Sequence, residues 1–347
     1  MSLIVEIKKR LGEFLLDVSL ETQGGVSGLL GASGSGKSMT LMCIAGIVKP
    51  DSGTIVLNGR VLFDSERRVN LTPQKRRVGY LFQNYALFPH MTVRQNILCG
   101  LRSERSKINK ERLLREIMKP MHLIGLENRL PGQLSGGQQQ RAALARILIS
   151  DPEMLVLDEP FSALDSHLRE QLQAETGKFL ERFGKDTLLV THNRDEAYRL
   201  CGTIALIDSG KLIIHKPAKQ LFADPESRYA AALTGCKNIV GAEKSGEYEV
   251  FIPAWNLNFT TSEFVRDDIC AIGIGARSFN PDEAHNRFPV YITDEIESPF
   301  EYSIRFRFAG QRKNSQNLWW GIAKDIKAEQ YTTALGVSPD DIMLLYN

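Results

Sequence analysis

The sequence contains few cysteines and no long apolar run. Its five cysteines among 347 residues are odd in number and dispersed, and none forms a CxxC pair: Cys43, Cys99, Cys201, Cys236 and Cys270. A disulfide framework or a zinc site is therefore not indicated, and reduced, mostly buried thiols are favoured. No uninterrupted apolar stretch approaches the roughly 18 residues typical of a membrane span. The N-terminus "MSLIVEIKKRLGEF" becomes charged too early for a secretory signal. We expect a cytosolic protein unless another molecule anchors it.

An excess of one charge is also absent. The 43 lysines and arginines nearly balance the 41 aspartates and glutamates, and the formal net charge is +2. Because no long run of one sign appears either, nothing indicates a polyanionic partner, and no nucleic acid is expected. Hydrophobic residues make up 43% and charged residues 24% of the chain, as in an ordinary globular protein. The length suggests about two domains.

Short apolar runs bounded by glycine recur in the first two thirds of the chain: "GVSGLLG", "RVGYLF", "MLVLD" and "TLLVTH". Because they alternate with helix-like segments, they predict strands buried on both faces of a mostly parallel sheet, and thus an α/β fold. Residues 84–150 differ, since "NKERLLREIMKPMHLIGL" places apolar side chains on one helical face. We expect an inserted helical subdomain there, with a break or kink at Pro120.

From about Cys236 the pattern changes to short alternating runs such as "YEVFIP", "VYITDEIE" and "EYSIRFRFAG". Alternation with a period of two, interrupted by glycine and proline, predicts a small antiparallel β domain. We therefore expect an α/β domain over residues 1–235 and an all-β domain over residues 236–347.

The stretch "GASGSGKS" fits the pattern GxxxxGK[ST], and it lies between an apolar run and the helix-like "MTLMCIAGI". In that context glycines let backbone N–H groups face phosphates, and the helix N-terminus adds positive potential. We expect Lys37 to reach the β- and γ-phosphates of a nucleotide and Ser38 to ligate Mg²⁺. The expected ATP-binding residues are Gly31, Ala32, Ser33, Gly34, Ser35, Gly36, Lys37, Ser38 and Met39.

The stretch "MLVLDEP" places two adjacent carboxylates at the end of an expected strand. Asp158 can hold Mg²⁺ through water. Glu159 is then placed to orient or deprotonate the water that attacks the γ-phosphate. For Asp158 alone, the alternative is an acidic helix N-cap at a strand end.

A second glycine-led helix start, "LSGGQ", covers Leu134 to Gln138. Its first turn offers free N–H groups and the positive end of a helix dipole, which again suits an anion. The loop at Gly31–Ser38 already holds the phosphates of its own nucleotide. We therefore expect this second site to contact the ATP of another copy, so that two chains face head to tail.

Six motifs in order, "GASGSGKS", "YLFQN", "LSGGQ", "LVLDEP", "SALD" and "VTHN", resemble those of the ATP-binding cassette (ABC) ATPase family over about residues 3–235. The resemblance implies that Gln83 contacts Mg²⁺ and the attacking water. It also places Asp165 at a dimer seam and His192 at the γ-phosphate. By the same resemblance, the residues that grip the γ-phosphate of the opposing subunit's ATP are Ser135, Gly136, Gly137 and Gln138.

One position departs from the family pattern. An aromatic residue near position 11 usually stacks on adenine, whereas this chain has Leu11 in "KKRLGEF". Phe14 could substitute for it, or it could belong to the core.

The chain has neither the long coiled coils nor the second cassette typical of family members in DNA repair or translation. The resemblance therefore implies transport. Lacking a membrane span, such a protein docks on two separate transmembrane permease subunits at the cytoplasmic face of the membrane and works with an extracytoplasmic substrate-binding protein. In "NYALFPHMTVRQNI", Tyr85, Leu87, Phe88 and Met91 would form the socket for the permease, or they fill the helical subdomain. A non-transport mechanical switch remains the rival, whereas a P-loop kinase has no use for "LSGGQ".

The phrases "VLFD" and "LTPQKRRVGYLFQ" resemble ATPase subunits of molybdate importers. Tungstate, sulfate, sugar and polyamine importers share the ATPase motifs and stay open as alternatives. The C-terminal region resembles the OB-like regulatory (TOBE-like) domain of many importer ATPases. There, Lys237 and Asn238 could donate hydrogen bonds to a regulatory oxyanion, or they form a solvated turn near a domain boundary.

Overall fold

The structure is a computed structural model that describes residues 2–101, 106–162, 166–312, 315–324 and 333–346. The chain forms two compact units, Met1–Ala218 and Lys219–Asn347. This division falls earlier than the expected one after residue 235. The reason is helix α9 (Arg228–Thr234), which packs against the strands of the second unit.

Within the described residues, eleven strands of the first unit form one sheet in the order β6-β5-β4-β1-β2-β11-β10-β3-β9-β8-β7. Their bounds are β1 Leu3–Leu11, β2 Phe14–Thr22, β3 Val26–Leu30, β4 Ser52–Leu57, β5 Arg60–Asp64, β6 Val69–Asn70, β7 Val78–Leu81, β8 Met154–Asp158, β9 Thr187–Thr191, β10 Thr203–Asp208 and β11 Lys211–Pro217. Strands β10, β3, β9, β8 and β7 run parallel. Strands β1, β2, β4, β5 and β6 pair antiparallel. Strand β11 pairs parallel with β2 and antiparallel with β10. The predicted α/β fold is thus confirmed, but the sheet is mixed and not mostly parallel, because hairpin strands add an antiparallel part.

The parallel strands are the apolar runs of the sequence. Every residue of β8 and β9 is buried, as expected for strands covered on both faces. The helices of this unit are α1 Lys37–Ala45, α2 Pro73–Arg76, α3 Val93–Leu98, α4 Lys107–Met118, α5 Gly136–Leu148, α6 Ser166–Phe183 and α7 Arg194–Leu200, with a 3₁₀ turn at Pro131–Gln133.

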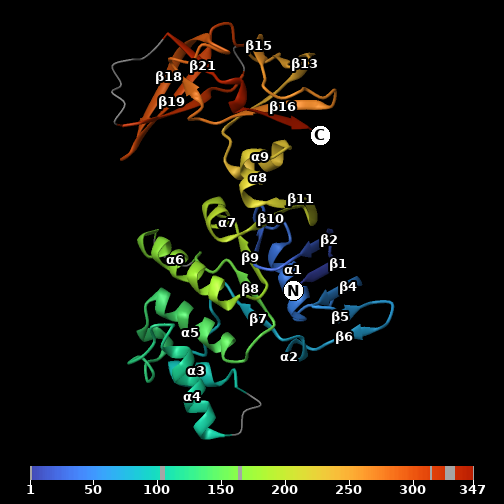
Figure 1. Ribbon diagram of the computed structural model, residues 1–347, viewed down its shortest axis with the longest axis vertical. Coiled ribbons are helices and arrows are strands. Elements are labelled where there is room, and N and C mark those ends of the chain that lie inside the picture. Colours follow the sequence, from blue (N-terminus) through green and yellow to red (C-terminus); the bar gives the residue numbers. More distant parts are fainter. Residues whose placement is uncertain (1, 102–105, 163–165, 313–314, 325–332, 347) are drawn as a thin grey trace. The chain divides into compact units, whose positions relative to one another are not determined.

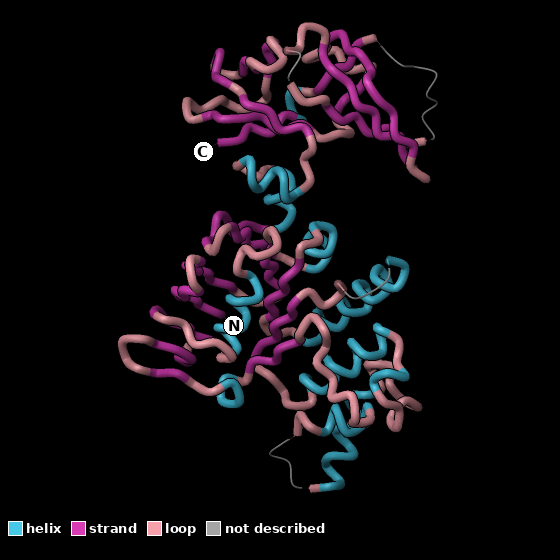
Figure 2. The backbone as a smooth tube through the Cα atoms, turned by 180° about the vertical axis from the view of Figure 1, so that it is seen from behind, coloured by secondary structure: helices cyan, strands magenta, loops and turns pink. Residues whose placement is uncertain are grey.

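A helical segment lies between β7 and β8, where the sequence predicts it. It contains α3, α4 and α5, which group beside the sheet in Figures 1 and 2. Leu114 and Met118 are the buried face of α4. The helix ends at Met118, which confirms the break expected at Pro120.

The C-terminal end of α1 is fixed by a buried arginine. Arg76 is 0% exposed, and its Nη1 donates to the carbonyl oxygens of Cys43 (2.7 Å) and Ile44 (2.8 Å). These carbonyls belong to the last turn of α1, where carbonyls lack the usual partner four residues later; that of Cys43 also accepts from the Gly46 N–H (3.2 Å). Because α1 begins at the phosphate loop, Arg76 holds the far end of the helix that carries this loop.

The second unit is built from three sheets in which the paired strands are antiparallel, in the orders β12-β16-β22, β13-β14-β15 and β17-β21-β18-β19-β20. The bounds are β12 Asn238–Gly241, β13 Glu243–Gly246, β14 Glu249–Ile252, β15 Leu257–Thr260, β16 Ile269–Ile274, β17 Phe279–Asn280, β18 Phe288–Glu297, β19 Glu301–Phe308, β20 Leu318–Ala323, β21 Ala334–Val337 and β22 Ile342–Tyr346, preceded by α8 Ala218–Ala223 and α9, with a 3₁₀ turn at Pro339–Asp341.

Aromatic side chains fill the core of this second unit. Trp255, Phe259, Phe306 and Phe308 are each at most 2% exposed, and their rings contact one another. The expected all-β, OB-like domain is therefore confirmed. Among the helices that the structure describes, none is long and apolar enough to cross a membrane.

Candidate active site

The loop from Gly31 to Gly36 joins the end of β3 to the start of α1, as the sequence predicts. Gly34 and Gly36 have φ values of 79° and 102°, in the left-handed region that favours glycine. A Cβ on Gly31 would lie 2.2 Å from the carbonyl oxygen of Ile207, so only glycine fits there. The glycine spacing of the motif is thus required by the backbone of the loop.

The N-terminus of α1 offers donors for an anion. Gly36 has no side chain to cap it, and the first turn contains no acidic residue. The first amide hydrogen bond within the helix is donated by Thr40 to the carbonyl oxygen of Gly36 (2.9 Å). The N–H groups of Lys37, Ser38 and Met39 precede it and have no carbonyl of their own helix to contact. They form a ready site for phosphate oxygens.

Lys37 lies folded over the loop. Its side chain is nearly buried (5% exposed), and Nζ donates to the carbonyl oxygens of Gly31 (2.9 Å) and Ala32 (2.7 Å). Burial lowers the pKa of Lys37, although the charges of Glu159 and Asp158 act in the opposite direction. The ammonium is thus held at the loop, beside the N-terminus of α1.

Asp158 ends β8 and is held by two hydroxyl groups. Ser38 Oγ donates to its Oδ1 (2.8 Å) and Tyr80 OH donates to its Oδ2 (2.8 Å). Two of the three expected metal ligands, Ser38 and Asp158, are therefore in direct contact. Because the next helix, α6, begins only at Ser166, Asp158 is not a helix N-cap.

Tyr80 is the site residue that the sequence analysis missed. It lies on β7 inside the "YLFQN" phrase, and in the parallel register it is opposite Val156 of β8. Its hydroxyl can therefore reach the carboxylate that follows two residues later. The only local signal was a polar group in an apolar run, three residues before Gln83.

Glu159 brings the other expected catalytic residues together. Gln83 Nε2 lies 3.3 Å from its Oε2, and His192 Nδ1 lies 3.2 Å from its Oε1. The backbone of Glu159 has a φ of 44°, and its N–H donates to the carbonyl oxygen of Val190 (3.0 Å). This bond to β9 fixes the carboxylate next to His192. The three residues come from the ends of three strands.

The carboxylate of Asp158 borders open space. A hollow of about 590 Å³ is lined by Ser38, Gln83, Asp158 and Ser162 among others. Among the described residues, no group of three or more His, Cys, Asp or Glu side chains could hold a metal ion. Mg²⁺ does not need such a group, because it keeps several waters and binds through one or two carboxylates and substrate phosphates. The hydroxyl oxygen of Ser38 and the carboxylate oxygens of Asp158 are suitable Mg²⁺ ligands of this kind.

The "LSGGQ" turn begins α5 with a capping box. Ser135 Oγ accepts from the Gln138 N–H (3.3 Å), and Gln138 Oε1 accepts from the Ser135 N–H (3.0 Å). The free donors of this turn are therefore fewer than expected, and they are the N–H groups of Gly136 and Gly137. A Cβ on Gly137 would lie 2.8 Å from Leu172 Cδ1, so glycine allows α5 to approach α6 here. This turn does not line the hollow at Ser38. Asp165, expected at a dimer seam, lies outside the described residues.

The two candidates for adenine stacking face different surroundings. Leu11 and Phe14 pair at the end of the β1–β2 hairpin, where Leu11 is 41% exposed. The ring of Phe14 lies against the loop, since a Cβ on Gly36 or Gly210 would be 3.1 Å from its Cζ. Phe14 is partly buried and packs against the loop and the core of this unit.

The expected permease socket divides into buried and exposed residues. Tyr85 is 4% exposed, and its hydroxyl donates to the carbonyl oxygen of Pro160 (3.2 Å). Its place in the socket is a correction, because the side chain packs inside the unit. Phe88 and Met91 are exposed, at 48% and 37%, and can contact another molecule.

The expected oxyanion residues of the second unit also differ from each other. Asn238 is 3% exposed, and Nδ2 donates to the carbonyl oxygens of Ile274 (3.1 Å) and Trp319 (2.9 Å). Its Oδ1 accepts from the Trp319 N–H (2.6 Å). Because both amide hydrogens bind backbone, Asn238 joins strands and has no donor left for an oxyanion. Lys237 is exposed, with Nζ 4.9 Å from the centre of the Trp319 ring.

Known proteins share the sequence of a large part of this chain. A family profile described as "ABC transporter" matches residues 15–162. "Molybdenum import ATP-binding protein ModC" of Paramagnetospirillum magneticum is 39% identical over 241 residues, which are 69% of this chain and 65% of that protein. "Probable sulfate/thiosulfate import ATP-binding protein CysA" of Chlorella vulgaris is 42% identical over 242 residues, which are 68% of this chain and 100% of that protein.

A solved structure has the same fold. The dimeric, post-hydrolysis state of the ATP-binding cassette MJ0796, bound to ADP and Pi, is 29% identical with a TM-score of 0.53. The match covers 63% of this chain and 99% of that chain.

The first prediction concerns the proton of Tyr80. Burial, aided by the charge of Asp158, raises the pKa of Tyr80, and burial raises the pKa of Tyr85 to about 12. The folded protein thus keeps protons that an unfolded chain releases above about pH 10. The stability they contribute is present below that pH and is lost as the pH rises further. In an absorbance titration of tyrosinate, Tyr80→Phe should ionise as wild type until alkaline unfolding and then show one tyrosinate fewer.

If Tyr80→Phe already shows one tyrosinate fewer than wild type while the protein is still folded, the hydrogen bond to Asp158 does not hold the proton.

Proposed function

The chain belongs to the ABC transporter family, among its ATPases of import type, and from this premise we propose that it powers uptake across a membrane by hydrolysing ATP at the site around Glu159. The observation that carries the proposal is the convergence of Gln83 and His192 on the carboxylate of Glu159. This carboxylate follows directly on Asp158, which contacts the phosphate loop through Ser38.

Each residue has a defined part in the hydrolysis. The phosphates of ATP lie against the N–H groups that begin α1, with the ammonium of Lys37 on the β- and γ-phosphates. Glu159 accepts a proton from water as the water oxygen bonds to the γ-phosphorus and the bond to the β-phosphate oxygen breaks, giving ADP and Pi. Gln83 and His192 orient this water and the γ-phosphate. Mg²⁺, held by Ser38, Asp158 and Gln83, neutralises charge on the phosphates when it is bound.

Replacement of the base gives the second prediction. Glu159→Gln keeps the shape of the side chain but cannot take a proton, and a general base contributes typically 10²–10⁴-fold. We expect kcat for phosphate release to fall at least about 100-fold. The Kd for ATP should change less than about threefold, since the phosphate loop is intact. Phosphate release and equilibrium dialysis measure the two quantities.

Glu181→Gln, at an exposed position on α6, serves as the control and should hydrolyse ATP as wild type does. A Glu159→Gln protein with nearly normal turnover would remove the proposed base.

Two copies assemble head to tail in this proposal, with each Ser135–Gln138 turn on the ATP of the other copy and Asp165 at the seam. The N–H groups of Gly136 and Gly137 at the start of α5 suit a phosphate oxygen. Support comes from the hollow at Ser38, which this turn does not line, and from the dimeric state of the related cassette MJ0796. Each site is then incomplete without the partner.

Mixing two inactive variants gives the third prediction. Lys37→Ala removes the ammonium from one loop, and Ser135→Asp keeps a good N-cap but places a carboxylate against the γ-phosphate. Random pairing makes about half of the dimers mixed, and each mixed dimer has one intact site. We expect each variant alone to be inactive and the mixture to recover up to about a quarter of wild-type hydrolysis.

The control in this experiment is Ser135→Thr, which caps the helix without adding charge and should stay active. A mixture as inactive as its components, although mixed dimers are detected by mass spectrometry of crosslinked protein, would rule out shared sites.

Transport requires membrane partners. The protein docks on two permease subunits at the cytoplasmic face, and an extracytoplasmic binding protein delivers the substrate to them. Phe88 and Met91 support this proposal, because both are exposed and lie in the segment that follows Gln83. A rigid-body movement of this segment can pass the closure of the two copies to the membrane subunits.

We further propose that the substrate is molybdate. The similarity to ModC and the phrases "VLFD" and "LTPQKRRVGYLFQ" support molybdate, whereas the similarity to CysA makes sulfate the main competitor. Proteoliposomes that contain the protein with its proposed permease and binding protein allow a test. The fourth prediction is that binding protein loaded with molybdate stimulates ATP hydrolysis at least about fivefold more than binding protein offered sulfate.

Tungstate should stimulate as molybdate does, because the two oxyanions share charge and shape. Stimulation by sulfate alone would reject molybdate and leave the importer proposal intact. A complex that is stimulated by no loaded binding protein would reject the importer proposal itself.

A further inference from the structure

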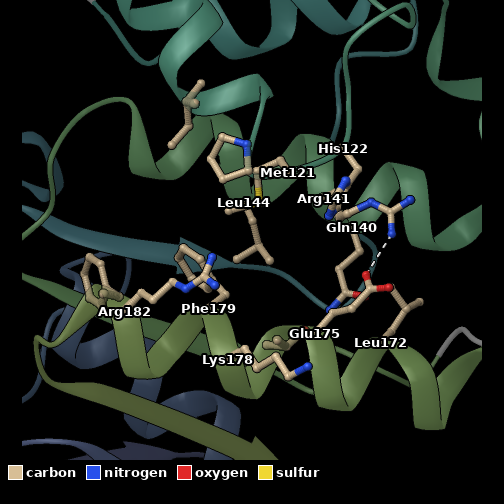
Figure 3. A pocket seen from close by; sticks show the side chains of 14 residues that line it. Met121, His122, Gln140, Arg141, Leu144, Leu172, Glu175, Lys178, Phe179 and Arg182 are labelled. Carbon is tan, nitrogen blue, oxygen red and sulfur yellow. Dashed lines mark hydrogen bonds and ion pairs between the residues drawn. The ribbon is translucent and has the colours of Figure 1, made fainter.

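A cavity lies between α5 and α6, closed at one end by the segment after α4. Its volume is about 480 Å³, within the range of pockets for small organic molecules. Figure 3 shows the side chains that line it, among them Met121, Leu144 and Phe179. No lining residue belongs to the phosphate loop or to the group around Glu159. The cavity is thus a different place from the nucleotide site.

A buried amide lines the cavity and has no partner. Gln140 is 1% exposed, and neither its Nε2 nor its Oε1 has a hydrogen-bond partner among the described residues. Figure 3 shows this side chain running from α5 toward α6. The nearby carboxylate of Glu175 is occupied, since Arg141 Nη1 (3.0 Å) and Gln171 Nε2 (2.9 Å) donate to it. Buried polar groups are normally satisfied, so a donor and an acceptor at one spot indicate a ligand.

Two exposed basic side chains of α6 form part of the rim of the cavity. Lys178 and Arg182 lie one turn apart on α6 and are exposed, and both line the cavity. Neither forms an ion pair with any residue that the structure describes. His122 lines the cavity as well. An anionic group on a ligand would be attracted to this rim.

We propose that this cavity binds a small amphipathic anion with an apolar body and an amide-like group, the chemistry of an N-acylated apolar amino acid. The apolar body packs between Leu144 and Phe179. The amide of Gln140 exchanges one donated and one accepted hydrogen bond with the amide of the ligand. The carboxylate of the ligand lies at Lys178 and Arg182.

Such a ligand would brace α5 against α6. Gln140 and Leu144 are one and two turns after Gly136 on the helix that begins with the "LSGGQ" turn. Gly137 already contacts Leu172 of α6 at the start of this helix. The ion pair of Arg141 with Glu175 (3.0 Å) also joins the two helices, so an occupied cavity adds a further contact between them, farther from that turn. Binding itself does not depend on ATP hydrolysis, so it can be tested alone.

The probe is N-acetylphenylalanine, titrated into the full chain by calorimetry and by ligand-observed NMR. A ligand of this size in a fitted pocket is expected to bind with a Kd of about 1 mM or tighter. Two comparison probes each lack one group: 3-phenylpropionate lacks the amide, and N-acetylphenylalaninamide lacks the charge. We expect each to bind at least about threefold more weakly than N-acetylphenylalanine.

Variants connect the groups of the probe to the residues. Gln140→Leu should abolish the preference over 3-phenylpropionate, and Lys178→Glu with Arg182→Glu should abolish the preference over the uncharged probe. Leu144→Trp should fill the cavity and remove binding. Arg115→Glu, at an exposed position on α4 outside the cavity, is the matched control and should bind as wild type does.

If Leu144→Trp does not fold, Gln140→Leu still tests the proposal. Because it replaces an unpartnered buried amide by an apolar group, its Tm should equal or exceed that of wild type. The proposal is overturned if N-acetylphenylalanine does not bind, if Gln140→Leu binds the three probes in the wild-type order, or if ATP displaces the probe.

Discussion

The carboxylate of Asp158 holds the site together. It is 8% exposed, and a charge so far out of water needs hydrogen-bond donors at both oxygens. Ser38 and Tyr80 provide them from α1 and β7, while Asp158 itself ends β8. Three elements that are distant in the sequence, α1, β7 and β8, are thereby joined at one carboxylate. If the phosphate loop, β7 and β8 moved independently, the buried carboxylate of Asp158 would lose a hydrogen-bond partner.

Parallel strands explain why the motifs converge. Strands β3, β9, β8 and β7 are neighbours that run in one direction, so their carboxyl ends meet at one edge of the sheet. The phosphate loop, His192, Glu159 and Gln83 follow these four strands in turn. A sequence pattern that identifies each strand and the residue after it therefore locates most of the site, although no local pattern states a distance. This is why the phosphate loop, Asp158 and Glu159 could be predicted from the strand pattern, whereas the roles of Gln83 and His192 came from the family resemblance.

Features that depend on register between distant segments could not be predicted. In the sequence, Tyr80 is one residue of an apolar strand. Only the register of β7 with β8 brings its hydroxyl to Asp158. Asn238 was read as a free donor, yet its amide is used by the backbone of Ile274 and Trp319, far along the chain. Tyr85 shows the same limit, because its partner is the carbonyl of Pro160. The antiparallel half of the sheet was missed for a related reason, since hairpin strands and parallel strands share apolar content.

The ammonium of Lys37 already has acceptors within its own loop, at the carbonyl oxygens of Gly31 and Ala32. A phosphate oxygen that takes this ammonium must replace them. The gain in free energy is then the difference between two sets of charge-assisted bonds and not the full strength of one. When a nucleotide binds, the ammonium of Lys37 exchanges carbonyl acceptors for phosphate acceptors. After the products leave, the bonds to Gly31 and Ala32 can form again and keep the loop in shape for the next cycle.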